Sequence, residues 1–296
     1  MTSYQNSTIL NELSLGKTTQ YSDKYNPSLL QAVPRSLNRD SLAITENNLP
    51  FKGEDVWYGY ELSWLNEKGK PVVAVAEFRF PCTSPNLVES KSFKLYLNGF
   101  NQTRFASWQA VEALLINDLS NTAGAKAQVH LYSVNNCPAL NISSDKFICI
   151  DEEDISVIDY QYKPDLLLSN TNVDNTKAGN TCLDETTTNI TEEYIVSHLL
   201  KSNCLITNQP DWASVYIHYK GQAINHQLLL KYLISFRQHN EFHEQCVERI
   251  FCDISHYCKP EALTIFARYT RRGGLDINPF RSTENNTAPN KRTLRQ

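Results

Sequence analysis

Cys204 and Asp211 are the first side chains in this sequence whose types and spacing could do chemistry. Both lie in SNCLITNQPDWASVYIHY, residues 202–219, where a polar stretch with Pro210 leads into strand-like alternation. A thiolate is a strong nucleophile once its pKa is lowered, and a carboxyl group beside it can relay protons. The segment between them is predicted to fold back as a loop, but most cysteines are simply buried small side chains. The pair alone therefore leaves open whether Cys204 is a nucleophile or a structural thiol.

Glu89 marks a second candidate site, in VESKSFKLYLNGF, residues 88–100. It follows the loop PCTSPNL and precedes a charged and aromatic run, and functional residues concentrate in and beside such loops. Glu and Lys at short spacing, here Glu89, Lys91 and Lys94, are equally typical of the solvated start of a helix. Both interpretations remain open for this stretch.

His243 and Glu244 are neighbours in FHEQCVERI, where a helix is predicted to begin. A glutamate in the first turn suits the helix dipole and needs no ligand. At the edge of a cleft, the carboxylate could instead accept N–H hydrogen bonds from a purine-like ring. In RYTRRGGLDINPFR, Arg272 and Gly273 belong to a group of arginines beside two glycines. Such a group indicates either a phosphate-binding site or a solvated loop.

A zinc site is a further reading of the cluster formed by His243, Cys246, Cys252, His256 and Cys258. Its cysteines are six residues apart instead of two to four, and at helical pitch they do not share one face. We therefore expect no metal. The sequence also has no G-x-G-x-x-G stretch, so a nicotinamide cofactor would not be held by a Rossmann domain.

The composition limits the classes of protein to which the chain can belong. A formal net charge of −4 over 296 residues gives no basic surface for nucleic acid. No apolar run approaches the roughly 20 residues of a membrane helix, and the N-terminus has no secretory pattern. The 8 cysteines are irregularly spaced, which favours reduced thiols over a disulfide framework. We expect a cytoplasmic protein that binds neither nucleic acid nor membrane.

The chain resembles itself at a fixed offset, which predicts a duplicated fold. Shifting the second half back by 136 positions gives seven identities within 17 positions. They pair Tyr96 with Tyr232, Leu97 with Leu233, Phe100 with Phe236, Gln102 with Gln238, Gln109 with Gln245, Val111 with Val247 and Glu112 with Glu248. Each half also reads as strands, then helices, then a strand. This order predicts an α+β unit with helices on one face of an antiparallel sheet.

An Asn- and Thr-rich stretch separates the two halves and is typical of a linker or a long surface loop. The last residues are polar and mildly basic, so we expect them to be solvated. The predicted segments are an N-terminal extension (1–50), a first module (51–168), a polar linker (169–190), a second module (191–282) and a tail (283–296).

Together these motifs resemble the NADPH-dependent 7-cyano-7-deazaguanine reductases of queuosine biosynthesis, in their long, two-module form. The resemblance is carried by NQPDWA after Cys204, by ESKSFKLY, by FHE and by RYTRRGGLDINP, and it covers residues 50–282. It implies tandem tunnelling-fold (T-fold) modules, which are antiparallel sheets with helices on one face. It also implies a homodimer joined through sheet edges. The linker is longer than the family needs, and the N-terminal 25 residues are unassigned.

The resemblance further implies a reaction, the four-electron reduction of a nitrile to a primary amine by two NADPH. Cys204 would add to the nitrile carbon as a covalent thioimide, Asp211 would protonate the nitrogen, and His243 would assist proton transfer. Asp211 must hold its proton near pH 7, which burial favours. The implied substrate-binding residues are Val88, Glu89, Ser90, Phe242, His243 and Glu244, and the implied NADPH-binding residues are Ser90, Lys91, Arg272 and Gly273.

The motifs are divided between the halves, which predicts one site per chain where the halves meet. ESKS occurs only in the first half, and at the offset of 136 Glu89 falls on Asn225. The nucleophile and FHE occur only in the second half. Two other functions compete with this reading: a zinc-dependent T-fold hydrolase acting on a pterin or purine nucleotide, and a purine-binding module without catalysis.

Overall fold

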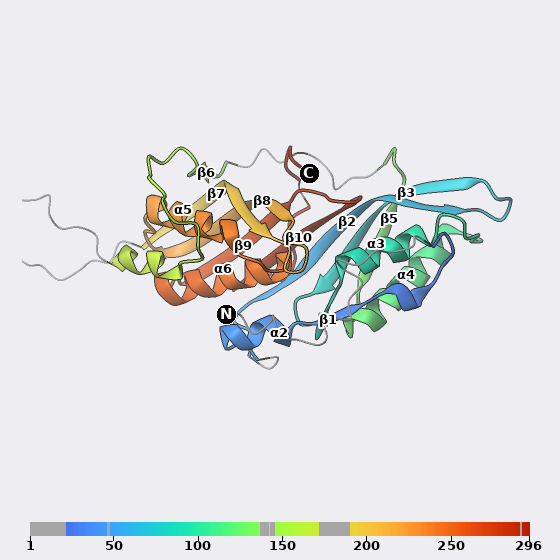
Figure 1. Cartoon of the computed structure of the whole chain (residues 1–296), viewed down its shortest axis with the longest axis horizontal. Helices are drawn as coiled ribbons and strands as arrows, with labels where there is room; N and C mark the ends of the chain where they lie inside the picture. Colours follow the sequence, from blue (N-terminus) through green and yellow to red (C-terminus); the bar gives the residue numbers. More distant parts are fainter. Residues whose placement is uncertain (1–21, 46–47, 137–141, 143–145, 172–189, 291) are drawn as a thin grey trace, which may run out of the picture.

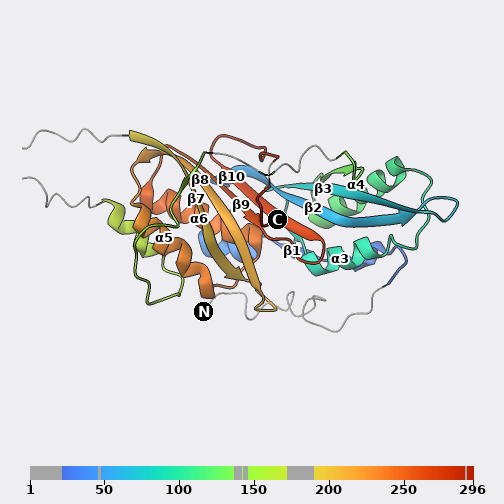
Figure 2. The same ribbon diagram turned by 90° about the horizontal axis from the view of Figure 1, so that it is seen from above.

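One continuous sheet runs through the whole molecule. The computed structural model describes residues 22–45, 48–136, 142, 146–171, 190–290 and 292–296 (Figure 1). Eight strands are arranged in the order β5-β3-β2-β10-β9-β8-β7-β6, and all pairs except β6–β7 are antiparallel. The helices cover one face of this sheet, as Figures 1 and 2 show. This confirms the predicted α+β class.

The two halves repeat one order of elements. In the first half these are β2 (Lys52–Leu65), β3 (Pro71–Pro81), α3 (Ser90–Asn98), α4 (Trp108–Ala123) and β5 (Gln128–Tyr132). In the second half they are β7 (Ile190–Asn203), β8 (Pro210–Gln222), α5 (His226–Ser235), α6 (His243–Cys258) and β9 (Ala262–Tyr269), followed by β10 (Leu275–Ser282). Short elements precede and join them: η2 (Pro27–Leu29), β1 (Ala32–Pro34), α2 (Ser36–Arg39), η3 (Asp40–Leu42), β4 (Asn86–Val88), β6 (Ile148–Cys149), η4 (Pro164–Thr171) and η5 (Phe236–Gln238).

The duplication predicted from the sequence is visible in buried polar contacts as well as in element order. Tyr96 on α3 donates from its hydroxyl to Asp118 Oδ2 on α4 at 2.7 Å. Tyr232 on α5 donates in the same way to Asp253 Oδ2 on α6 at 2.5 Å. Burial would penalise either group if it lacked a partner, so each hydrogen bond fixes the two helices of its half against each other.

The last strand, β10, joins the two halves. It pairs with β2 from Leu275↔Gly59 to Ser282↔Lys52, and on its other side it pairs with β9. Gly53 in β2 has a φ of +139°, and a Cβ there would lie 2.1 Å from the Phe280 carbonyl oxygen, so only glycine fits this close approach. Two hydrophobic cores lie under the sheet, one beneath each half.

The structure corrects part of the predicted division of the chain. Residues 148–168 were assigned to the first module, but β6 pairs with β7, and Ile150 and Leu167 are buried in the core of the second half. Their apolar side chains are too sparse in sequence to reveal which half they cover. The predicted linker, 169–190, lies almost wholly outside the described residues.

The C-terminal tail is largely exposed, as predicted, but three of its residues are packed on the sheet. Ala288, Thr293 and Gln296 are buried. The side-chain amide of Gln296 donates to the Tyr269 carbonyl oxygen at 3.3 Å and to Asn278 Oδ1 at 2.5 Å. A polar composition suggested exposure, but polar side chains can equally satisfy the polar groups of a covered sheet.

Candidate active site

A hairpin brings Cys204 and Asp211 together. Strands β7 and β8 pair Ser202 with Asp211, and Cys204 lies just past the end of β7. Residues two apart on a strand share a face, so Cys204 lies on the face of Ser202 and hence of Asp211. The Cys204 amide donates to the Gln209 carbonyl oxygen at 2.9 Å, which closes the loop. The seven-residue spacing is therefore a folded-back turn, as the sequence predicted.

The loop that carries Cys204 is rigidly tied at its far end. Asn208 has a φ of +54°, a left-handed conformation that asparagine tolerates better than most residues. Its amide donates to the Cys204 carbonyl oxygen at 3.1 Å. Cys204 itself is 5% exposed and packs with Val33, Leu87 and Phe242.

Asp211 faces one cation and one imidazole. Its carboxylate is buried, with 6% of the residue exposed. Arg272 Nη1 lies 3.1 Å from Asp211 Oδ1 as an ion pair without hydrogen-bond geometry, and His243 Nε2 lies 3.6 Å from the same oxygen.

His243 is the first residue of α6, and it is neutral at physiological pH. Burial lowers the pKa of its imidazole to about 4, against the opposing attraction of Asp211. The ring meets Tyr269 edge-on, with ring centroids 4.1 Å apart. A neutral imidazole can accept a proton on one nitrogen and give one up from the other, which suits a relay beside Asp211.

Six residues predicted to bind substrate line one cavity. The cavity is lined by Val33, Trp57, Leu87, Val88, Glu89, Ser90, Phe242, His243, Glu244 and Ile277. The first-half and second-half motifs thus meet, and Cys204 packs on three of the same residues, Val33, Leu87 and Phe242. The cavity measures only 10 Å³, about one water molecule, so a bicyclic base can enter only if side chains such as Phe242 move.

Glu89 is held by the backbone that follows it. It is the N-cap of α3, and its Oε1 and Oε2 accept from the amides of Lys91 and Ser92, both at 2.7 Å. Glu89 is 1% exposed. A carboxylate has about four acceptor sites. Capping occupies two of these sites, and the remaining lone pairs are fixed in direction, which is what recognition of N–H donors needs.

Glu244 sits in a setting that favours its neutral form. Burial, with the nearby charge of Asp55, raises the pKa of its carboxyl group to about 8, although Arg35 and Arg281 oppose the rise. It lies in the first turn of α6 and is 3% exposed. The unliganded carboxyl group is therefore largely protonated at pH 7.

A buried network of charges packs against the helix that carries Glu244, and nothing in the sequence indicated it. Its members are Arg35, Arg39, Asp55, Glu248 and Arg281, all at most 3% exposed. Arg281 Nη2 lies 2.8 Å from Glu248 Oε1, and its Nη1 lies 2.8 Å from Asp55 Oδ1. Glu248 is one helical turn beyond Glu244, so the network fixes the α6 face that points at the cavity.

Of the residues predicted to hold NADPH, Arg272 lies beside Asp211 and Gly273 lies against Lys94, a cation that we did not predict for this site. Gly273 has a φ of +60°, and a Cβ there would press on the Lys94 side chain at 3.1 Å. Lys94 lies in a separate cavity of 240 Å³ that Gly273 and Gly274 also line. Burial lowers the pKa of Lys94, and Arg272 adds to the effect. Two cations beside glycine backbone fit a phosphate-bearing cofactor.

The place of Lys94 in this site could have been predicted from its spacing to Ser90 and Lys91. It lies three residues after Lys91 and four after Ser90, so all three share one face of α3. In the sequence, Lys94 stands out only as part of a charged run. The Arg35–Arg281 network carried no comparable signal, because its members come from four elements far apart in sequence.

Within the described residues, the Cys and His side chains of α6 do not gather into a metal-binding group. Burial raises the pKa of the Cys246 and Cys252 thiols to about 12. Where the structure describes the chain, the one group of side chains able to hold a metal ion contains none of the five clustered residues. The zinc-dependent alternative therefore loses its ligands.

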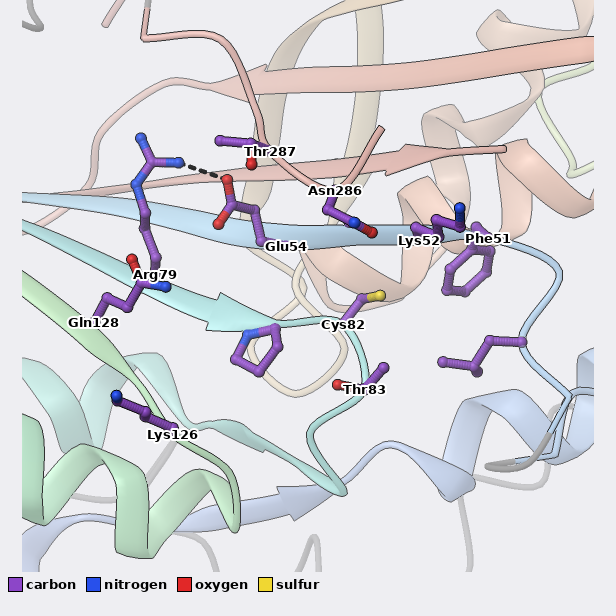
Figure 3. A pocket seen from close by; sticks show the side chains of 13 residues that line it. Phe51, Lys52, Glu54, Arg79, Cys82, Thr83, Lys126, Gln128, Asn286 and Thr287 are labelled. Carbon is purple, nitrogen blue, oxygen red and sulfur yellow. Dashed lines mark hydrogen bonds and ion pairs between the residues drawn. The ribbon is translucent and has the colours of Figure 1, made fainter. Parts of the chain in front are cut away.

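A larger cavity lies away from these motifs (Figure 3). It measures 500 Å³, and Arg79, on its wall, is neutralised by ion pairs with Glu54 and Glu77, both at 2.5 Å. None of the predicted site residues lines it. The size of a cavity therefore does not identify the active site of this protein.

Comparison with known proteins agrees with the motifs. Residues 21–131 match the family described as nitrile reductase, 7-cyano-7-deazaguanine-reductase N-term, and residues 210–288 match the family described as QueF-like protein. The NADPH-dependent 7-cyano-7-deazaguanine reductase of Colwellia psychrerythraea is 67% identical over the full length of both chains. The crystal structure of the archaeosine synthase QueF-Like in the apo form covers 36% of this chain and 100% of that chain, with 14% identity and a TM-score of 0.28, too weak a likeness to compare the folds.

The fold and these matches define a T-fold oxidoreductase that depends on NADPH. The chain belongs to the family of NADPH-dependent 7-cyano-7-deazaguanine reductases, as its motifs predicted. Within the described ranges, no helix is long and apolar enough to cross a membrane.

Proposed function

We propose that this chain reduces the nitrile of 7-cyano-7-deazaguanine to the aminomethyl group, using Cys204 as nucleophile. The observation that carries the proposal is the meeting of motifs from both halves at one cavity, with Cys204 packed against its wall. The overall reaction consumes two NADPH and two protons per nitrile, which balances four electrons.

Substrate binding rests on the two buried glutamates. Glu89, oriented by the amides of Lys91 and Ser92, offers its remaining lone pairs to N–H donors on the guanine-like edge. Glu244 accepts from the same edge once it has lost its proton. A buried polar pair of this kind rejects analogues that lack the donors, because the carboxylates would then be left unpaired.

The covalent step uses the groups gathered at the β7–β8 hairpin. The Cys204 thiol loses its proton as the sulfur adds to the nitrile carbon, and Asp211 gives its proton to the nitrile nitrogen, which forms a thioimide. The thiol proton replaces the one that Asp211 has lost. The neutral His243 imidazole, whose Nε2 lies 3.6 Å from Asp211 Oδ1, relays it by accepting a proton on one ring nitrogen as it gives one up from the other. NADPH, when bound, supplies the two hydrides that convert the thioimide to the amine and free Cys204.

Arg272 pairs with Asp211 and belongs to the proposed cofactor site, so cofactor binding can change the ion pair between Arg272 and Asp211. Its guanidinium, 3.1 Å from Asp211 Oδ1, stabilises the carboxylate, so donation by Asp211 requires the cation to turn away. The Arg272 side chain is 31% exposed and free to do so. Phosphate is a favoured partner of a guanidinium, and Ser90, Lys91, Lys94 and Gly273 complete the proposed cofactor site.

Intact-mass measurement tests the covalent mechanism directly. Protein mixed with 7-cyano-7-deazaguanine in the absence of NADPH should gain the mass of one substrate molecule. Cys204→Ala should gain none, whereas Cys252→Ser, a matched control in the α6 cluster, should gain as much as the unaltered chain. An unmodified mass in all three proteins would exclude the thioimide. An adduct on Cys204→Ala would move the nucleophile elsewhere.

We further infer a cytoplasmic homodimer that does not bind nucleic acid. Six cysteines in the described ranges are free thiols, which fits a reducing compartment. Strand β5 (Gln128–Tyr132) pairs with β3 and is the last strand on that side of the sheet within the described residues, which is where a second chain could add to the sheet. Light scattering of the purified protein should give twice the chain mass of 33.8 kDa. A monomer at micromolar concentration would contradict the dimer.

A further inference from the structure

Three side chains of different chemistry converge beside the middle of β7, outside the candidate active site. Cys149, Asp151 and His198 each offer one donor atom, and the three atoms lie within 4.8 Å of one another. We propose that Cys149, Asp151 and His198 form a binding site for a divalent transition metal, with Zn²⁺ as the ion that fits best. This inference does not depend on the reductase mechanism.

The pairing of β6 with β7 and a bulge in β7 bring these three residues together. Strand β6 runs parallel to β7 and pairs Cys149 with Val196. The register of β7 against β8 shifts between Ser197 and Leu200, which marks a β-bulge at His198 and Leu199. Bulges re-aim side chains and are frequent near functional sites. The bulge brings His198 beside Asp151, which follows Cys149 by two residues.

Further contacts orient two of the three ligands. Asp151 Oδ1 accepts from the Ser197 hydroxyl at 2.7 Å, and Asp151 Oδ2 accepts from the His198 amide at 2.9 Å. The His198 ring is fixed by a hydrogen bond between Nδ1 and Ser214 Oγ at 2.8 Å. Metal ligands in proteins are commonly oriented by such outer contacts.

The chemical types of the three ligand atoms determine which metal ion fits the site. A thiolate, an imidazole and a carboxylate suit Zn²⁺, whereas Mg²⁺ and Ca²⁺ prefer oxygen ligands alone. Three protein ligands would leave a fourth position for water. Cys149 and His198 are exposed, so an ion can reach them. Binding would replace the thiol proton of Cys149, because the thiolate is the form that coordinates.

A metal ion at this site would stabilise the fold and would take no part in the reduction. It ties the segment that begins with β6 to the edge of the second half, and that segment packs on α5 and α6. His198 precedes Cys204 by six residues along an extended strand, a separation of roughly 20 Å. Metal binding should therefore raise the thermal stability of the chain and leave its turnover unchanged.

Cobalt substitution tests the proposal, because Co²⁺ bound to thiolate gives a charge-transfer absorption band. The metal-free full-length chain titrated with Co²⁺ should develop this band at one equivalent, and Zn²⁺ should abolish it. Cys149→Ser should lose the band, and His198→Gln should weaken Co²⁺ binding at least about tenfold. Cys252→Ser, which alters a cysteine outside the site, should keep both the band and the affinity.

A second measurement needs no variant. Alkylation of Cys149 in the unaltered chain, followed by peptide mass spectrometry, should slow at least about tenfold with one equivalent of Zn²⁺, while Cys258 should react at an unchanged rate. Equal alkylation of Cys149 with and without Zn²⁺ would overturn the proposal, as would a cobalt band that survives in Cys149→Ser. Reductase activity that is lost on chelation would contradict the separation of the site from catalysis.

Discussion

Burial shifts the pKa values of the two ionisable residues at the start of α6 in opposite directions, and both shifts favour the uncharged form. It raises the pKa of Glu244 to about 8 and lowers the pKa of His243 to about 4. Both groups are therefore mainly uncharged at pH 7 in the unliganded pocket. These two groups therefore add no charge to the buried pocket before substrate binds. Glu244 becomes charged only when the N–H donors of the substrate are in place.

Binding of 7-cyano-7-deazaguanine at pH 7 should release a proton. The guanine-like edge presents N–H donors, so Glu244 must bind it as a carboxylate and lose the proton that its raised pKa retains. Calorimetry in two buffers of different ionisation enthalpy measures this release. Glu244→Gln should abolish the release and weaken binding about ten- to hundredfold. A binding enthalpy for the unaltered chain that is the same in both buffers would contradict the assignment.

The same residue should give the stability of the chain a defined pH dependence. The pKa of Glu244 rises from 4.5 unfolded to about 8 folded, so its contribution is fully present below pH 4.5 and is lost as pH rises through 8. Glu244→Gln should therefore stabilise the chain at pH 8.5, by on the order of 1–3 kcal/mol, and have little effect at pH 4.5. Urea unfolding at both pH values measures the difference.

Glu248, one turn further along α6, is the matched control for that experiment. Burial favours its protonated form, but the charges of Arg281 and Arg39 outweigh burial and lower its pKa. Glu248→Gln should destabilise the chain at pH 8.5, the opposite sign to Glu244→Gln. Equal signs for the two substitutions would show that the surroundings of Glu244 do not favour its neutral form.

At the scale of elements, the proposed covalent step depends on the turn between β7 and β8. The turn holds Cys204 on the face of Asp211, and it closes through Asn208, whose φ is +54°. Asn208→Val should strain this turn by roughly 1–2 kcal/mol, because a β-branched residue tolerates the left-handed region poorly. We expect adduct formation to slow roughly ten- to hundredfold through misplacement of the sulfur.

Asn208→Gly tests whether the rate of adduct formation depends on the backbone conformation at residue 208 or on the Asn208 side chain. Glycine adopts positive φ freely, so this variant should form the adduct at close to the normal rate. Stopped-flow measurement of adduct formation, with substrate affinity measured separately, compares the two variants. Equal slowing in both would assign the effect to the Asn208 side chain, which also contacts Asn240.

Local pattern predicted some of the elements but not how they assemble. Strand-like alternation after Pro210 predicted β8, and the helix predicted to begin at FHE is α6. The pairing of β10 with β2 could not be predicted, since nothing within LDINPF indicates a partner more than 200 residues earlier. The three buried residues of the tail and the Arg281 network could not be predicted for the same reason. Both depend on contacts between segments that have no local signature.

At the scale of the whole molecule, each half carries part of the proposed site that the other half lacks. Asn225 caps α5 as Glu89 caps α3, through a side-chain oxygen that accepts from the helix backbone. Both halves therefore have the cap, but only in the first half is the capping residue a carboxylate that also lines the cavity. Because β10 and the buried network hold the two halves in one sheet, we expect one complete site per chain.

Mixing two inactive chains should decide whether a site is completed within one chain. Glu89→Gln and Cys204→Ala each remove one half's contribution to the cavity. If a site takes Glu89 and Cys204 from the same chain, as this structure has them, the mixed and refolded variants should show no more activity than the better of the two alone. If partners in a two-fold dimer exchanged these residues, mixed dimers would hold one intact site, and roughly a quarter of normal activity would return. Chains tagged differently on each variant confirm by pull-down that mixed dimers have formed, so that an absence of activity identifies the single chain as the catalytic unit.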